Sequence, residues 1–316
     1  GSKLDLIINM IQHSYVDTVD TREIVENAIP VILKDLDPHT VYIPAKDMQR
    51  ANEGIVGNFG GVGVQFYKYL DTVTVVKVVP GGPSEKAGIM DGDRIVRVGD
   101  SVVAGVNKNT DQIMAMMRGE LGTKVELTIV RRGEPKPIKK EIIRGSIPVK
   151  SVDVAYMLND TTGYVKINTF GMHTYAEFMR SLVDLKQLGM RKVIIDLREN
   201  EGGVLPIAIQ MINEFLDANS LILYTQGQAQ PRTDYKSNGK GQFKDLRVDV
   251  LISEFSASAS EIFAGAIQDN DRGLIIGRRS FGKGLVQEQR PLPDGSALRL
   301  TVARYYTPSG RSIQKP

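Results

Sequence analysis

The chain has 316 residues, of which 41% are hydrophobic and 24% are charged, as expected of a globular protein of two or three domains. The net charge of +3 is too small to favour a nucleic-acid partner, and no basic run accompanies it. The absence of cysteine excludes disulfides, thiolate catalysis and cysteine–metal sites. No apolar run reaches the roughly 18 residues of a membrane-spanning helix. The opening Gly1-Ser2 is typical of a cloning scar, so we expect a signal or anchor segment to have been removed.

The first part of the chain predicts helices over residues 4–36. Asp20 has the capping position before the second helix, and Pro30 is expected to kink or divide it. His39, in the stretch LDPHT, follows the end of this helix and is expected to be an ordinary turn residue. The sequence therefore begins with a helical region.

A small mixed domain is expected next, between Gly54 and Gly145. It opens with the glycine-rich stretch GIVGNFGGVGVQF, and strands are predicted within 72–79, 91–100 and 121–133. A short helix is expected near 80–88 and a polar helix over about 110–118. From the residues alone, the glycine run is interpreted as a flexible hinge.

The last part alternates strands and helices. Strands are predicted at 162–170, 192–197, 248–253, 273–277 and 297–306, with helices after 174, 203 and 258. Two consecutive strand–turn–helix units predict a largely parallel sheet. The polar stretch 225–247 is expected to be an exposed hairpin or loop. The fold class is therefore α+β with several domains.

Four serines lie in the stretch SEFSASASEIF (253–263), where a strand gives way to a helix. Ser258 and Glu261 fit a helix capping box, but a cap does not explain the alternation of serine and alanine. A serine at this point also lies beside free backbone N–H groups at the positive end of a helix, where an oxyanion would be stabilised. Both interpretations, cap and nucleophile, follow from these residues.

A nucleophilic serine needs a base. His173 lies in a turn with no acid nearby to orient it, and is expected to be a surface residue. Lys283 lies between Gly282 and Gly284 in an apolar setting, where burial would lower the pKa of its amine. A lysine between two glycines is also common in surface turns.

The motifs together resemble the carboxyl-terminal processing proteases, also called tail-specific proteases, which are serine peptidases with a Ser/Lys pair. The resemblance rests on LDPHTVYI, GGVGVQF, PGGPSEKAGIMDGDRIVRVG, IIDLRENEGG, SASASEIFAGAIQD, GRRSFGKGLVQ and YYTPSGRSIQ, in this order along the chain. It implies an N-terminal helical region (1–53), an inserted PDZ domain (54–145) and a crotonase/Clp-protease-like α/β core (146–316).

The resemblance also implies site residues. The nucleophile would be Ser258, the base Lys283, and the residue that holds the amine Gln287. Oxyanion donors would be the N–H groups of Ala259 and of either Gly202 or Gly203, a choice that the sequence leaves open. In the PDZ domain, backbone N–H groups would bind a terminal carboxylate, and the matching residues are Gly61, Val62, Gly63 and Val64.

Three positions depart from the family pattern. Phe255 replaces an expected small residue, and Glu199 and Glu201 flank Asn200 where uncharged residues are frequent. None removes a catalytic atom, but they bear on substrate preference and on gating at rest.

The resemblance implies a peptidase of the periplasm or cell envelope that needs no cofactor, metal or nucleic acid. Its partners would be protein tails with accessible C-termini, and a homo-oligomer and an adaptor or activator protein are left open. Two alternatives remain: a non-catalytic PDZ scaffold with an inactive protease-like core, and a small-molecule serine esterase.

Overall fold

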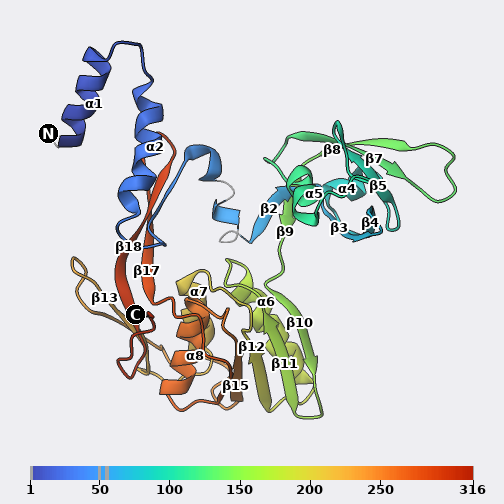
Figure 1. The fold of residues 1–316 in the computed structure, drawn as a ribbon. Coiled ribbons are helices and arrows are strands. Elements are labelled where there is room, and N and C mark those ends of the chain that lie inside the picture. Colours follow the sequence, from blue (N-terminus) through green and yellow to red (C-terminus); the bar gives the residue numbers. More distant parts are fainter. Residues whose placement is uncertain (1–2, 49–50, 54–56, 316) are drawn as a thin grey trace. The chain divides into compact units, whose positions relative to one another are not determined.

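The computed structural model describes residues 3–48, 51–53 and 57–315, and forms two compact units (Figure 1). The main unit comprises residues 1–51, 152–170 and 174–316, and the small unit comprises 52–151 with 171–173. Gly1-Ser2 and the predicted boundary at Gly54 lie outside the described residues. The small unit is therefore an insertion within the chain of the main unit.

The main unit begins with helices α1 (Lys3–Ser14) and α2 (Thr21–Leu33). The Asp20 side chain accepts the N–H of Arg22 and caps α2, as the sequence predicts. Pro30 does not divide α2, because the helix continues to Leu33. Pro30 has no N–H to donate to the carbonyl four residues earlier, so α2 continues past it with that one helical hydrogen bond missing. Among the described residues, no helix is long and apolar enough to cross a membrane.

The small unit is built on an antiparallel sheet of order β3-β4-β5-β7-β8, with β6 added to β5 and a separate pair β2-β9. Branched side chains from the strands and from α5 form its core, including Val73, Ile95 and Ile113. Asn109 and Gln112 cap α5 reciprocally. The elements are β2 (Asn58–Gly61), β3 (Val64–Tyr69), β4 (Thr72–Val78), α4 (Pro83–Lys86), β5 (Arg94–Val98), β6 (Ser101–Val102), α5 (Thr110–Met117), β7 (Lys124–Val130), β8 (Ile138–Ile143) and β9 (Gly145–Pro148).

The centre of the main unit is a sheet of order β10-β11-β12-β15-β16, in which only β10 runs antiparallel. Alternate residues of β11, β12 and β15, such as Val165, Ile195 and Val250, are buried in one core with α6, α7 and α8. The predicted parallel sheet is confirmed. The elements are β10 (Val152–Met157), β11 (Thr162–Ile167), α6 (Thr174–Gln187), β12 (Lys192–Asp196), α7 (Leu205–Asn213), β15 (Arg247–Ile252), α8 (Ala259–Asp269) and β16 (Ile275–Gly277).

A second sheet of the main unit has the order β1-β18-β13-β14, with β17 also paired to β18. Its elements are β1 (Val41–Ile43), β13 (Leu221–Gln226), β14 (Thr233–Lys236), β17 (Leu285–Pro291) and β18 (Ala297–Tyr306), and a 3-10 turn spans Ala45–Asp47. The hairpin expected within 225–247 is present as β13-β14. The stretch is not wholly exposed, however, because Phe243 and Leu246 are buried in the core.

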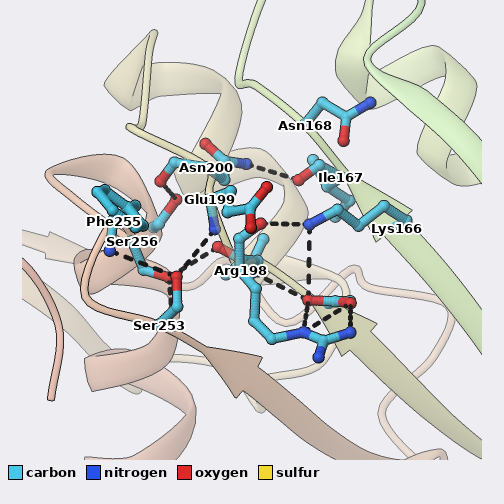
Figure 2. Close-up of polar contacts among 12 residues, drawn as sticks. Lys166, Ile167, Asn168, Arg198, Glu199, Asn200, Ser253, Phe255 and Ser256 are labelled. Atoms are coloured by element: carbon cyan, nitrogen blue, oxygen red, sulfur yellow. Dashed lines mark hydrogen bonds and ion pairs between the residues drawn. The ribbon is translucent and has the colours of Figure 1, made fainter. Parts of the chain in front are cut away.

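Two parallel neighbours, β12 and β15, end at the same edge of the sheet, and the functional loops follow them. Next to this edge Asp196 is fully buried, and Arg198, Lys166 and Tyr164 converge on its carboxylate. The Lys166 and Arg198 side chains can be followed in Figure 2. Burial would raise the pKa of Asp196, but the hydrogen bonds from Arg198 and Tyr164 outweigh it and hold the pKa at about 2. The start of the 197–203 loop is therefore held by an ionised buried group.

Candidate active site

A buried amide, Asn200, connects the loop after β12 to the rest of the sheet edge (Figure 2). Its Nδ2 donates to the carbonyl of Ile167 at 2.9 Å, and its Oδ1 accepts the N–H of Gly202 at 2.9 Å. Its backbone carbonyl accepts the N–H of Ala257 and the hydroxyl of Ser260. Asn200 thus fixes the 197–203 loop against the loop after β15.

Three of the four serines in the 253–260 stretch have structural partners. The Ser253 hydroxyl accepts the N–H of Glu199, the Ser256 hydroxyl donates to the carbonyl of Leu197, and the Ser260 hydroxyl donates to Asn200. Ser256 and Ser260 are completely buried. Their bonds explain why serine recurs in this stretch without assigning them chemistry.

Ser258 differs from these three serines in backbone conformation. It is partly exposed and has φ 54° and ψ −114°, a strained conformation for a residue with a side chain. It immediately precedes α8, so it lies at the positive end of that helix. Strain of this kind is frequent where a side chain must be presented to a ligand.

The two glycines of the 197–203 loop are held differently. Gly202 has φ 102°, and a Cβ there would lie 2.9 Å from the Ser258 Cβ and 3.0 Å from the Ala259 nitrogen. Its own N–H is used by Asn200. Gly203 has φ 141°, and within the described ranges its N–H has no acceptor. The N–H of Ala259, the first residue of α8, is likewise without an acceptor among the residues described.

The Glu261 carboxylate joins Ser258 to the loop between β16 and β17. This loop, residues 278–284, carries Lys283 and is called the lysine loop below. Its Oε2 accepts the N–H of Ser258 at 2.9 Å and the N–H of Lys283 at 2.9 Å, and its Oε1 accepts the N–H of Gly282 at 2.7 Å. The residue is 5% exposed. The predicted cap is therefore real, and the same carboxylate also holds the loop that carries Lys283.

Lys283 lies half-buried among charged groups from three parts of the main unit. Burial lowers the pKa of its amine, and the nearby charge of Arg299 on β18 lowers it further. Glu201 and Asp37 act in the opposite direction and raise the pKa. The net effect lowers the pKa, which favours the neutral amine that a general base requires.

The turn 37–40 is the part of the site that sequence reasoning missed. Asp37 accepts the hydroxyls of Thr40 and Thr301, which fastens the turn to β18. His39 lies in a turn as predicted, but it is not an isolated turn residue. Burial and the charge of Lys283 both lower the pKa of its imidazole. No local pattern in the sequence signals a contact between groups more than 240 residues apart.

Gln287 lies on β17, opposite Thr301 of β18. Its Nε2 is buried, and nothing in the described part of the chain accepts a hydrogen bond from it. An unpaired buried amide is costly, so this nitrogen is suited to a partner that arrives with a ligand. No group of three or more His, Cys, Asp or Glu in the described ranges could hold a metal ion.

The predicted peptide-binding residues form one loop of the small unit. Gly61 ends β2, Val64 begins β3, and Val62 is buried. Ser84 and Val79 donate their N–H groups to the carbonyls of Val62 and Gly63. The N–H groups of Val62 and Gly63 themselves have no acceptor among the described residues. Gly63 has φ 78°, which favours glycine.

Comparisons with known proteins match this arrangement. The sequence profile of peptidase family S41 matches residues 161–316, and that of the PDZ domain matches residues 60–142. A carboxy-terminal-processing protease of Bartonella bacilliformis is 37% identical over 315 residues, which cover 98% of this chain and 71% of the relative. The chain therefore belongs to the carboxy-terminal-processing proteases, serine peptidases of family S41 that carry a PDZ domain.

A Staphylococcus epidermidis protein named "Probable CtpA-like serine protease" is 34% identical over 313 residues. The match covers 98% of this chain, which spans 62% of the length of that relative. Among solved structures, the photosystem II D1 C-terminal processing protease has a TM-score of 0.57 and 27% identity. That match covers 99% of this chain and 91% of the other. The family predicted from the motifs is thus confirmed.

The Glu261 contacts predict that Glu261→Gln destabilises the protein. Glutamine has nearly the same shape as glutamate, but it has only one acceptor oxygen, and its NH₂ group would face backbone N–H groups that need an acceptor. We expect a loss of about 2 kcal/mol in the free energy of unfolding, because hydrogen bonds to a buried carboxylate are lost. Urea unfolding of the full chain measures it. Glu254→Gln, on the preceding loop and exposed, is the matched control and should change stability little.

Proposed function

We propose that the protein is an endopeptidase that cleaves protein tails with Ser258 as nucleophile and Lys283 as general base. The observation that carries the proposal is the shared Glu261 carboxylate, which binds the backbone N–H of both residues. One rigid group thus ties the hydroxyl-bearing and amine-bearing segments together. Membership of a peptidase family favours this function over an inactive scaffold. The PDZ domain argues against a small-molecule esterase, because such an enzyme would have no use for a domain that binds peptides.

In the proposed reaction, neutral Lys283 takes the proton of the Ser258 hydroxyl while the oxygen attacks the peptide carbonyl. The amide C–N bond then breaks, the leaving amine takes the proton from the lysine, and an ester joins the acyl group to Ser258. Water attacks this ester and gives its proton to Lys283, which returns a proton to the serine oxygen. The carboxylic acid product leaves, and the enzyme is restored.

The oxyanion formed in each step needs two donors. We assign them to the N–H groups of Ala259 and Gly203. Ala259 follows the nucleophile at the positive end of α8, and its N–H is free in the described part of the chain. The N–H of Gly202 donates to Asn200, so Gly203 is the better candidate of the two glycines. Gly202 instead allows the loop to approach the Ser258 Cβ.

Gln287 is proposed as a positioning residue for the lysine amine. It lies on β17, whose first residue comes two positions after Lys283. Its buried, unpartnered Nε2 is consistent with a side chain that gains its contacts only when substrate is present. Its role is to orient, and we assign it no proton transfer.

The small unit is proposed to capture the tail itself. Val62 and Gly63 offer N–H groups to a terminal carboxylate, and β3 offers an edge to which an extended peptide can add. We propose the domain limits 1–53, 54–145 and 146–316, a crotonase/Clp-like core, and a location in the periplasm or cell envelope. The substrates would be proteins with accessible, apolar C-termini.

Removal of either reacting group tests the mechanism. Ser258→Ala and Lys283→Ala should each lower kcat/KM on an unstructured protein substrate by roughly a thousandfold or more, without loss of fold. Ser220→Ala and Lys240→Ala, which lie outside the site, should stay near wild type. Turnover at the wild-type level in either site variant would refute the assignment.

The charges around Lys283 predict the pH profile. The rate should rise with pH through the lowered pKa of Lys283, because only the neutral amine accepts a proton. Glu201 raises that pKa, so Glu201→Gln should move the rising limb to lower pH. Arg299→Gln should move it to higher pH. Glu199→Gln is the matched control for Glu201, and a rate profile unmoved in both site variants argues against a lysine base.

Tail capture can be tested with a pair of peptides. A ten-residue peptide with an apolar C-terminus should bind Ser258→Ala protein, which does not consume it. The same peptide with a C-terminal amide should bind about tenfold more weakly or worse, because the carboxylate loses its N–H partners. Fluorescence anisotropy measures both affinities, and equal affinities would exclude recognition of the carboxylate.

A further inference from the structure

The segment after β18 folds back toward the lysine loop. We call residues 307–315 the C-terminal strap. Thr307 donates its N–H to the carbonyl of Arg311 at 3.0 Å, and Gly310 donates to Thr307 at 2.9 Å. Tyr306 and Ser312 then form an antiparallel bridge. The chain therefore reverses within five residues and runs back beside the end of its own strand.

The strap is fastened to the last turn of α8. The Asp269 carboxylate accepts the N–H of Ser309 at 3.0 Å and its hydroxyl at 2.7 Å, and it pairs with Arg311. Burial would raise the pKa of Asp269, but the hydrogen bonds from Thr307 and Ser309 hold it at about 2. Gly265, one turn earlier, leaves room for the Thr307 methyl group. The strap is thus docked through specific contacts, and the Asp269 carboxylate that makes them is ionised at neutral pH.

The far end of the strap contacts both glycines beside Lys283. The Gln314 Oε1 accepts the N–H of Gly284 at 3.0 Å, and Lys315 donates its N–H to the carbonyl of Gly282 at 3.0 Å. A Cβ at position 284 would lie 2.2 Å from the Gln314 nitrogen. A Cβ at position 282 would lie 2.4 Å from the Lys315 side chain. The two glycines are therefore required by the strap.

The lysine loop is bound to β18 by the Tyr305 N–H, which donates to the Gly284 carbonyl at 2.8 Å, and two further attachments lead back to α8. Glu261, in the first turn, binds the N–H groups of Gly282 and Lys283. Asp269, in the last turn, holds the strap, which binds the Gly284 N–H through a side chain. Of these contacts, only the one from the Gln314 side chain is made to the peptide group between Lys283 and Gly284.

We propose that Gln314 is a positioning residue for Lys283: it holds the peptide after the lysine so that the amine can reach Ser258 and is shielded from bulk water. This inference rests on the proposed Ser258–Lys283 chemistry. Without the Gln314 oxygen, the loop gains freedom and the amine becomes hydrated. Hydration favours the charged amine, so the base would be neutral only at higher pH.

The test compares two replacements of Gln314. Gln314→Met keeps the length and removes the acceptor, whereas Gln314→Glu keeps an acceptor oxygen. Gln314→Met should lower kcat about tenfold or more, leave KM unchanged, and move the rising limb of the pH profile to higher pH. Gln314→Glu should restore kcat on the alkaline plateau. Gln187→Met, at the exposed end of α6, is the matched control.

Wild-type kcat and an unmoved profile in Gln314→Met would overturn the inference. So would a loss of kcat in Gln314→Glu, on the alkaline plateau, as large as that in Gln314→Met. If Gln314→Met does not fold, Gln314→Ala carries the same expectation, with circular dichroism as the check on folding. Ser258→Ala and Lys283→Ala are measured in parallel. If these retain turnover, the proposed mechanism fails; if they are inactive while Gln314→Met is normal, only the role of Gln314 fails.

Discussion

The site depends on one carboxylate that accepts hydrogen bonds from two distant stretches of backbone. Glu261 reaches back to Ser258, three residues earlier, and across to Gly282 and Lys283, more than twenty residues later. The Ser258 hydroxyl and the Lys283 amine lie on separate loops that would otherwise move independently, and under the proposed mechanism small displacements of either group are costly. Because Glu261 lies in the first turn of α8, the helix that fixes one partner also fixes the other.

The local structure around the candidate site could largely be predicted from the sequence, because its residues lie within short motifs. The spacing of Ser258 and Glu261 gave the helix start, and the glycines beside Lys283 gave a site of close backbone approach. The second attachment of Glu261 could not be predicted, because a capping box describes contacts along one helix only. The turn that carries Asp37 and His39 was missed because its partners are distant in the sequence: Thr301 lies on β18 and Lys283 in the loop before β17.

The fold was predictable where burial repeats with a clear period. The parallel strands β11, β12 and β15 are buried on one face against helices and were found from their apolar runs. Strands β8, β10 and β17 were not, since they are short or half-exposed and their polar residues mask the alternation. Phe243 shows the reverse error. A polar surrounding stretch predicted exposure, although Phe243 and Leu246 are both buried in the core.

The unusual backbone of Ser258, the proposed nucleophile, carries a cost in stability at a single residue. Its φ of 54° and ψ of −114° cost roughly 1–3 kcal/mol for any residue with a Cβ, and the rest of the fold absorbs this cost. Glycine would adopt the same conformation with little strain. Glycine in place of Ser258 would therefore relieve this strain, so under the proposed mechanism the fold gives up some stability in order to present a hydroxyl group.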